Sequence, residues 1–475
     1  MHAKALVIVL LLAATAIGVV VSAPAARSGA LINSQLVEET GATAALGGGD
    51  HVFVRFGDDA AFGVVYGTTA NPNNIYIVAI EARYLGVAQV FDQANTSVAT
   101  NRPIKIYTLY ALKLDSLIEF RDGNGNNIAD YARAYNSTTG GFTDYYARLT
   151  DTLYKKVDLR TNWTRSPIVE ANGTTYRNWT FSLSAQNLTY APVANYTGSV
   201  AGVLPLVRFT FHLNASLEQV DNASVPQWRV TVGTVGGNTV VTDISRMANL
   251  TGISGKVVHY DLKWDQNIEG WTFAAGNAAG ARRRILVEFG AVVGNLIPAA
   301  IVDAWFQSRV MARMGETGWA QFTTAGGTST ANDTTRYLTV QRLASPNLDF
   351  TGNSTRIADL VWVGTSTVDG VAQPVFGEVV GGFRLTAIGE RGNAFVGFVL
   401  LAGLSFRGGA SIIHDPTVTT DIQADLQLPT TPGAGGAPYV VAAAAALVIA
   451  IALIVAVIVM RRRKRETPPP PPPGS

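Results

Sequence analysis

Apolar and polar residues alternate in many short segments of the chain. Residues 207–213 read Val-Arg-Phe-Thr-Phe-His-Leu, so a period of two places every apolar side chain on one face. The same alternation occurs within residues 52–56, 228–232, 258–264 and 383–387. Val, Thr, Tyr, Phe and Trp recur in these segments, and 47 glycines supply turns between them. The pattern predicts many short strands, each with one buried face.

Two segments depart from this alternation. Residues 394–406 are apolar at nearly every position and too short to span a bilayer, which indicates a central strand buried on both faces. Residues 298–314 carry apolar side chains at helical spacing and predict a helix that packs on the core. The fold class is therefore mainly β. We expect two β-sandwich-like domains, 27–240 and 241–425, with a boundary near residues 233–252, because the Gly-, Asn- and Thr-rich segment 233–255 carries turn signals.

Long apolar runs near both ends predict the topology. Residues 1–26 resemble a signal peptide, with an apolar run followed by small residues, although an uncleaved anchor is the alternative. Residues 439–460 are uncharged and long enough to cross a bilayer as a helix. A flexible Pro/Gly stalk, 426–438, precedes this helix. We therefore expect a single-pass protein of the cell membrane, with its bulk outside and residues 461–475 in the cytoplasm.

The cytoplasmic tail combines a basic block with a proline run. The block is a stop-transfer signal that marks the cytoplasmic side, and the hexaproline after it predicts polyproline II. The five basic residues are Arg461, Arg462, Arg463, Lys464 and Arg465. Since the whole chain has a formal net charge of +2, the exported part is near neutral, which argues against nucleic-acid binding. The absence of cysteine excludes disulfides and thiolate metal sites.

Acceptor triplets for N-glycosylation, Asn-x-Ser/Thr, are about three times more frequent than chance predicts. We expect N-linked glycans, and hence turns or outward strand faces, at Asn95, Asn136, Asn162, Asn172, Asn178, Asn187, Asn195, Asn214, Asn222, Asn249, Asn332 and Asn353. Ten of the twelve lie from Asn95 to Asn249, so the later half of the ectodomain has fewer glycan sites and could pack against a neighbour. Glycans without disulfides favour a prokaryotic, archaeal-type cell surface.

One segment has the spacing of a calcium loop. Oxygen-bearing side chains stand at relative positions 1, 3, 5 and 9, and a backbone carbonyl at position 7 would join them. The predicted ligands are Asp122, Asn124, Asn126, Ile128 and Asp130. The segment resembles the Asp-x-Asp-x-Asp-Gly-x-x-Asp loops of thrombospondin type 3 and dockerin-like repeats, and of β-domains on prokaryotic envelope proteins. That resemblance covers about a dozen residues and implies a calcium cofactor; a plain Asn/Gly turn is the alternative.

Two positions of the loop differ from that pattern. Position 6, which requires positive φ, is Asn127 rather than glycine, and position 12, where a bidentate acid is expected, is Arg133. Glu119 or Asp144 could supply the missing carboxylate if the fold returns either to the loop. Few charged ligands imply weak binding, on the order of 0.1–1 mM.

No catalytic motif is recognisable in the sequence. The five histidines form no zinc-ligand pattern, and neither a nucleophile elbow nor a phosphate-binding loop is present. We therefore expect no catalytic residues and no enzymatic activity. The reading that fits best is a structural or adhesive glycoprotein of the cell envelope, with the membrane and neighbouring envelope proteins, or further copies of itself, as partners. A ligand-binding ectodomain of a receptor or transport system is the alternative, and an exported hydrolase is the second alternative.

Overall fold

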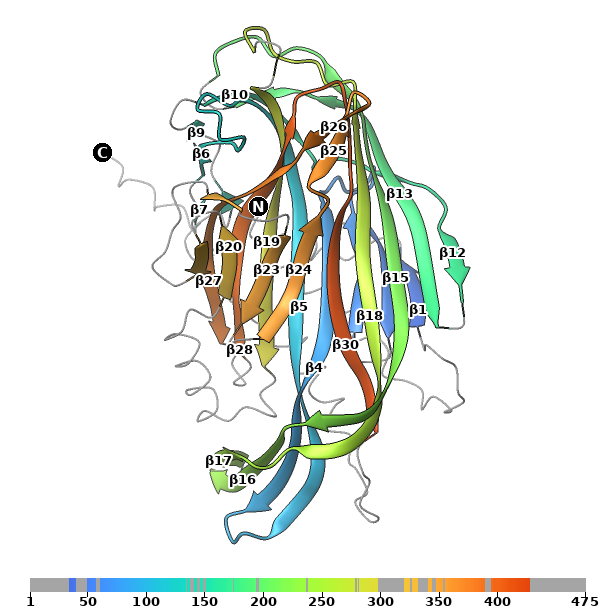
Figure 1. Ribbon diagram of the computed structural model, residues 1–475, viewed down its shortest axis with the longest axis vertical. Helices are drawn as coiled ribbons and strands as arrows, with labels where there is room; N and C mark the ends of the chain where they lie inside the picture. Colours follow the sequence, from blue (N-terminus) through green and yellow to red (C-terminus); the bar gives the residue numbers. More distant parts are fainter. Residues whose placement is uncertain are drawn as a thin grey trace, which may run out of the picture.

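The structure is a computed structural model. It describes residues 34–39, 49–56, 60–133, 135–136, 141–142, 146–147, 151–173, 175–193, 196–235, 238–277, 280, 282–297, 320–324, 327–331, 341–343, 347–352, 355–388 and 394–427. Within these ranges strands are the main element and there is no helix, so the mainly β prediction is confirmed. Two large sheets run along the long axis of the molecule (Figure 1).

The first sheet has 13 strands among the described residues, nine of them in one continuous path. In order across the sheet, the path is β1 (Ser34–Glu39), β2 (Asp50–Phe56), β3 (Ala60–Tyr66), β4 (Ile75–Asp92), β5 (Ser97–Arg121), β19 (Arg283–Ile297), β28 (Ala394–Arg407), β27 (Phe376–Ile388) and β22 (Gln341–Arg342). Branching from it are β10 (Thr152–Asp158), β14 (Ala191–Pro192), β16 (Gln227–Val235) and β17 (Asn238–Arg246). Neighbours along the path are antiparallel, whereas β16 lies parallel to β4.

The second sheet also has 13 strands in the described part of the chain. Its path is β11 (Thr164–Arg165), β13 (Tyr176–Thr189), β15 (Val203–Val225), β18 (Leu250–Glu269), β30 (Pro416–Gln427), β24 (Thr355–Trp362), β23 (Asn347–Gly352), β20 (Ala320–Thr324) and β21 (Gly327–Ala331). The side branches are β12 (Val169–Asn172), β25 (Thr365–Val368), β26 (Val371–Pro374) and β29 (Ser411–His414). Two short pairs complete the list: β6 (Tyr131–Ala132) with β9 (Tyr146–Ala147), and β7 (Tyr135–Asn136) with β8 (Gly141–Phe142).

The alternating segments are strands, as the sequence predicted. In β15 the apolar side chains of residues 207–213 are fully buried, whereas Arg208 between them is exposed. The all-apolar segment 394–406 is confirmed as a central strand, because β28 pairs with β19 on one edge and β27 on the other. Strands of this kind bury side chains on both faces, so their sequence loses the period of two.

One apolar core joins the two sheets. Its buried side chains run from Val52 in β2 to Val418 in β30, and include the tryptophans of β13 and β18. Across the interface, Phe62 of β3 stacks on Tyr260 of β18 with ring centroids 4.5 Å apart. Aromatic pairs of this kind add to the free energy gained from burying their surface. The core therefore holds the sheets face to face as a sandwich.

The predicted domain boundary near residues 233–252 falls inside strands. Its residues belong to β16, β17 and the start of β18. Strands from both sides of that position pair within each sheet, because β5 is hydrogen-bonded to β19 and β15 to β18. In the described residues the two predicted β domains thus share both sheets and one core. Alternation predicts strands but not their partners, since pairing depends on contacts far apart in the sequence.

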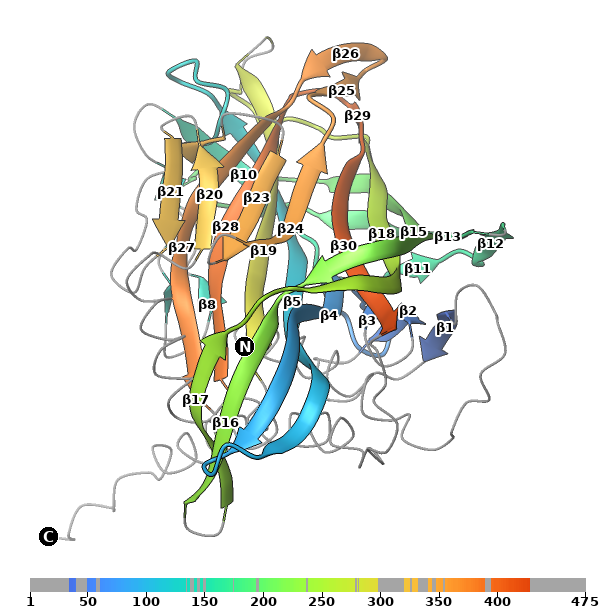
Figure 2. The same cartoon turned by 60° about the horizontal axis from the view of Figure 1, so that its bottom comes forward.

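An arm extends beyond the sandwich. It is built from β16, β17 and the hairpin ends of β4 and β5, and it projects at the bottom of Figure 1 and comes forward in Figure 2. A small cluster that includes Ala88 and Val230 holds it together. Gly86, with φ +134°, lies where β4 meets β16, and a Cβ there would be 2.1 Å from the carbonyl oxygen of Pro226. Glycine at this position therefore permits the close crossing.

Several predicted segments lie outside the described residues: the signal peptide 1–26, the helix 298–314, most of the stalk 426–438, the membrane span 439–460 and the tail 461–475. Within the described part of the chain, no helix has the length and apolar character that crossing a membrane requires.

Candidate calcium loop and the buried charges around it

The loop 122–130 leaves the end of β5 and folds around the carboxylate of Asp122. One oxygen, Oδ1, accepts hydrogen bonds from the backbone N–H groups of Gly125 and Asn126 at 2.7 and 3.2 Å. The other, Oδ2, accepts one from the N–H of Asn127 at 2.9 Å. Asn127 has φ 67°, which confirms the positive φ expected at this position. The side chain of Asp122 is thus an internal anchor for the turn.

The amide side chains of the loop converge on Asp130. Nδ2 of Asn124 donates a hydrogen bond to Oδ2 of Asp130 at 2.7 Å, and Nδ2 of Asn126 donates to the same oxygen at 2.9 Å. Their amide oxygens accept backbone N–H groups within the loop instead, those of Asn126 and Ile128, each at 3.0 Å. Four of the five predicted ligand residues therefore use their polar side-chain atoms to hold one another or the loop backbone.

Asp151, just before β10, closes the loop. Its Oδ1 accepts the N–H of Gly123 at 2.8 Å and its Oδ2 accepts the N–H of Asp130 at 2.9 Å, so one carboxylate joins both ends. Burial raises the pKa of Asp151 to about 6, and the charges of Asp130 and Asp122 add to this rise, while the two backbone hydrogen bonds oppose it. The sequence analysis did not find this residue, because nothing in local spacing links it to the loop.

Glu378 of β27 reaches the loop from the sheet beneath. Its Oε2 accepts the N–H of Ala129 at 2.7 Å, and the side chain is fully buried. Its Oε1 is buried without a hydrogen-bond partner in the described residues. Burial raises the pKa of Glu378 well above its usual value, and the charges of Glu288, Asp130 and Asp151 raise it further. A buried carboxylate oxygen without a hydrogen-bond partner costs free energy, so Oε1 of Glu378 is the oxygen at this site that would gain from a bound proton or cation.

Arg284 of β19 supplies positive charge beside the loop. Its guanidinium donates hydrogen bonds to Oγ of Ser405 at 2.7 Å, to the carbonyl oxygen of Ser405 at 3.1 Å and to Oδ1 of Asn127 at 3.1 Å. Burial lowers the pKa of Arg284 to about 10, although the negative charges of Asp122 and Glu378 oppose this fall. Four carboxyl groups, those of Asp122, Asp130, Asp151 and Glu378, thus surround a loop against which this guanidinium packs.

The donor set has the chemistry of a calcium site without its coordination geometry. Carboxylate and amide oxygens are the ligands that calcium prefers. In the described residues, however, no three acidic or histidine side chains are arranged around a common point as metal ligands. A cation here would require the Asn124 and Asn126 amides to rotate, so that oxygen rather than nitrogen faces Asp130.

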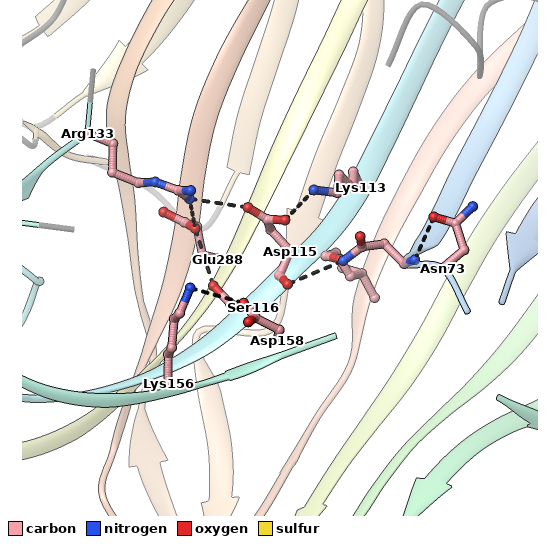
Figure 3. Close-up of polar contacts among 10 residues, drawn as sticks. Asn73, Lys113, Asp115, Ser116, Arg133, Lys156, Asp158 and Glu288 are labelled. Carbon is pink, nitrogen blue, oxygen red and sulfur yellow. Dashed lines mark hydrogen bonds and ion pairs between the residues drawn. The ribbon is translucent and has the colours of Figure 1, made fainter. Parts of the chain in front are cut away.

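A second group of charges joins β5 and β19 to Arg133, which follows the loop in the chain (Figure 3). Arg133 donates to Oε2 of Glu288 at 2.6 Å and lies 3.2 Å from Oδ2 of Asp115, which also pairs with Lys113. Tyr131 donates its hydroxyl to Oε1 of Glu288 at 2.7 Å. Although burial raises the pKa of Asp115, the lysine and the arginine lower it more, so the group stays ionised. Arg133, at position 12 of the predicted loop, therefore pairs with the carboxylates of Glu288 and Asp115 and supplies no ligand for calcium.

Of the two residues suggested as the missing carboxylate, the structure describes Glu119, and its side chain does not reach the loop. Glu119 lies on β5 but binds Trp271 and Asn277 instead, with Trp271 Nε1 at 3.1 Å from Oε2. Its neighbours on the strand, Ile118 and Phe120, face the opposite side, where they pack with the residues that follow the loop. Asp144 lies outside the described residues. The carboxyl groups that do approach the loop are those of Asp151 and Glu378.

Sequon asparagines whose side chains are described are all accessible to solvent. Six are exposed: Asn95, Asn162, Asn172, Asn187, Asn222 and Asn249. Two are partly exposed: Asn178 and Asn214. Asn95 has positive φ between β4 and β5, whereas Asn187 and Asn222 have positive φ inside β13 and β15, at positions that the strand pairing skips. By contrast, Asn73, Asn74 and Asn277 are buried, and none of these is in a sequon. Only the backbone of Asn136 is described, and Asn195, Asn332 and Asn353 lie outside the described residues. The predicted stop-transfer residues 461–465 also lie outside them.

Comparison with known proteins adds no relative. No protein-family model matches the chain, and no curated protein matches it significantly.

Proposed function

We propose that this chain is a single-pass, membrane-anchored cell-surface glycoprotein with a structural or adhesive role in the envelope. The observation that carries the proposal is the separation of asparagines by environment. Every described sequon side chain is open to solvent, whereas the buried asparagines stand outside sequons. N-linked glycans are bulky and must project into water, so an exported glycoprotein requires this separation and a cytoplasmic protein has no need of it.

The arrangement of the sheets supports a role in display. Two sheets share one long core, and the arm projects beyond it (Figure 2). Three sequons, those of Asn95, Asn222 and Asn249, lie on the arm or on the strand ends next to it. A rigid sandwich with sugar at its projecting end suits a surface layer that is exposed to the surroundings of the cell.

Calcium is the cofactor that the loop chemistry favours. Its ligands would be Asp122, Asn124, Asn126, Asp130 and the carbonyl of Ile128, and the cation would offset the surplus of buried negative charge. Glu378, with one unpartnered oxygen, is the additional carboxylate that the sequence pattern lacked. Calorimetric titration of the full chain in detergent, after chelator treatment, tests this role. Calcium should bind and raise the melting temperature, and Asp130→Asn should weaken both effects; no heat and no shift would refute it.

The cellular part of the proposal has its own test. Protease added to intact cells should digest the bulk of the protein and spare a fragment containing residues 439–475. Glycopeptide mapping of the native protein should find sugar at the exposed sequons, and imaging of envelopes should show an abundant coat or lattice. A chain that is protected from protease in intact cells, or that carries no glycan, would overturn the proposal.

A further inference from the structure

Three buried polar side chains meet on the core side of the first sheet, away from the loop. Lys155 of β10 and Glu119 of β5 are direct partners across adjacent antiparallel strands, so their side chains share a face. Asn277 lies in the segment that leads into β19, which also pairs with β5. All three are buried, with 2%, 0% and 7% of their surfaces exposed. Residues of these types are rarely inside a protein unless they interact with one another.

The Glu119 carboxylate contacts both of the other side chains. Its Oε1 accepts a hydrogen bond from Nδ2 of Asn277 at 2.8 Å, and its Oε2 lies 3.8 Å from Nζ of Lys155. The backbone N–H of Ala274 and the indole N–H of Trp271 fix the carboxylate in place, at 3.0 and 3.1 Å. An amine, a carboxyl group and a primary amide are therefore brought together in a site without free access to water.

Burial of Lys155 favours a neutral amine, whereas the aromatic rings and oxygen acceptors around its Nζ favour the charged form. Its Nζ lies 3.4 Å from the centroid of the Tyr190 ring and 5.6 Å from that of Trp271, and it donates to the carbonyl oxygen of Thr272. Burial lowers the pKa of Lys155, although the charge of Glu119 opposes the fall. A lysine that loses its proton more readily is a better nucleophile, as in enzymes that use lysine to attack carbonyl carbon.

The Asn277 amide is the corresponding electrophile. Its Oδ1 is buried and has no hydrogen-bond partner in the described residues, so its capacity to accept a hydrogen bond is unused before the carbonyl is attacked. Tyr154 and Tyr196 hold the preceding backbone through the carbonyl oxygens of Gly276 and Ala275, at 3.4 and 3.3 Å. The segment is therefore positioned before any covalent chemistry takes place.

We propose that Lys155 and Asn277 become joined by an intramolecular isopeptide bond, with Glu119 carrying the protons. Glu119 takes a proton from the Lys155 ammonium, and the freed lone pair of Nζ attacks Cγ of Asn277. The Cγ–Nδ2 bond then breaks as Glu119 returns the proton to the departing nitrogen. One hydrogen stays on the new secondary amide and the rest leave with Nδ2 as ammonium, so Glu119 ends as a carboxylate. The exchange of one amide for another requires no oxidant or cofactor.

Such a bond would give this chain the cross-link that cysteine cannot provide. It would tie β10 to the segment before β19, two places far apart in sequence that flank β5 in the sheet. A cross-link over a long stretch of chain removes much of the conformational freedom of the unfolded state. The inference does not depend on the proposed envelope role, because it rests on buried groups inside the sandwich.

Peptide mapping of the purified full-length protein tests the bond directly. Trypsin should release residues 149–156 joined to residues 264–282, lighter by one ammonia than the sum of the two peptides. Neither peptide contains a sequon, so glycans do not interfere. Recovery of the two unmodified peptides in full yield from the folded protein would overturn the proposal.

Two lysine variants provide a matched comparison. Lys155→Arg keeps the charge and the contact with the Tyr190 ring but has no amine, so the linked peptide should vanish. Lys156→Arg changes the neighbouring lysine, which pairs with Asp158 at 3.2 Å, and the linked peptide should remain. Glu119→Gln should also prevent the bond. Should Lys155→Arg fold poorly, Asn277→Ala is a second variant in which the linked peptide should be absent. A linked peptide that persists in Lys155→Arg would place the bond elsewhere and refute the assignment.

Discussion

The stability of the protein in calcium-free buffer should depend on pH through Asp151. Its pKa is about 6 in the folded chain and 3.8 in the reference state, so the folded state binds the proton more tightly. A raised acid pKa stabilises the fold at low pH, and this stability is lost as the pH rises from the lower to the higher value. For these two pKa values, linkage gives a loss of at most about 2 kcal/mol between about pH 4.5 and about pH 7.5.

The comparison with Asp151→Asn isolates this contribution. The variant cannot ionise at this position, so the difference in unfolding free energy between wild type and variant should change by about 2 kcal/mol across that range. Glu378, whose raised pKa has the same sign of effect, and His414, whose lowered pKa has the opposite sign, are present in both proteins. Their contributions largely cancel, although loss of the Asp151 charge also eases ionisation of Glu378.

Denaturant unfolding at a series of pH values, with chelator present, measures the difference. Saturating calcium should reduce the pH dependence of this difference in unfolding free energy, because a bound cation favours the ionised carboxylate. A difference that stays constant with pH would show that Asp151 has an ordinary pKa in the fold and would remove the argument for surplus buried charge at the loop.

Three further substitutions follow from the structure. Glu378→Gln keeps an acceptor for the Ala129 N–H without a buried charge. In chelator, and at pH above the raised pKa of Glu378, it should stabilise the fold by about 1–3 kcal/mol while weakening calcium binding; a lower melting temperature under these conditions would contradict this. Gly86→Ala should destabilise the arm by about 2–4 kcal/mol, measured by hydrogen exchange in β16 and β17, whereas Gly370→Ala, also at positive φ but with open space around it, should cost about 1 kcal/mol; equal effects would refute the role of close packing. Asn95→Gln should remove one glycan by mass spectrometry and Asn101→Gln, also at positive φ but within β5 and outside a sequon, should remove none; an unchanged mass pattern for the first would show that this site carries no sugar.

Sequence patterns predicted individual strands better than the way those strands combine. Alternation located β2, β15, β16, β18 and β27, and an all-apolar run located β28, because each pattern reports burial of the faces of one strand. The pairing of β5 with β19 left no comparable signal, since any strand with one apolar face can pair with many others. A Gly-, Asn- and Thr-rich stretch suggested a linker, yet the same residues suit the exposed strands of a projecting arm.

The loop illustrates the same limit at the scale of side chains. Spacing predicted the positive φ of Asn127, which depends on neighbours in the chain. It did not predict Asp151, Glu378 or Arg284, because these residues come to the loop from other strands. The expected carboxylate, Glu119, is closer in sequence, but strand alternation turns it to the opposite face. Local chemistry can therefore be read from the sequence, whereas the partners of a buried charge depend on the tertiary fold.

In the described part of this cysteine-free chain, buried carboxylates fasten loops to the sheets around Glu119 and around Glu378. Glu119 accepts the N–H of Ala274, and Glu378 accepts the N–H of Ala129. Loop N–H groups that are withdrawn from water need acceptors, and a carboxylate on a strand provides a strong one, but each brings a charge that must be balanced. At Glu119 the cation that faces the carboxylate before any cross-link forms is Lys155, within the protein. Around Glu378 the carboxyl groups outnumber the adjacent Arg284, so this is the place where protons or cations from the surroundings should control how firmly a loop is held.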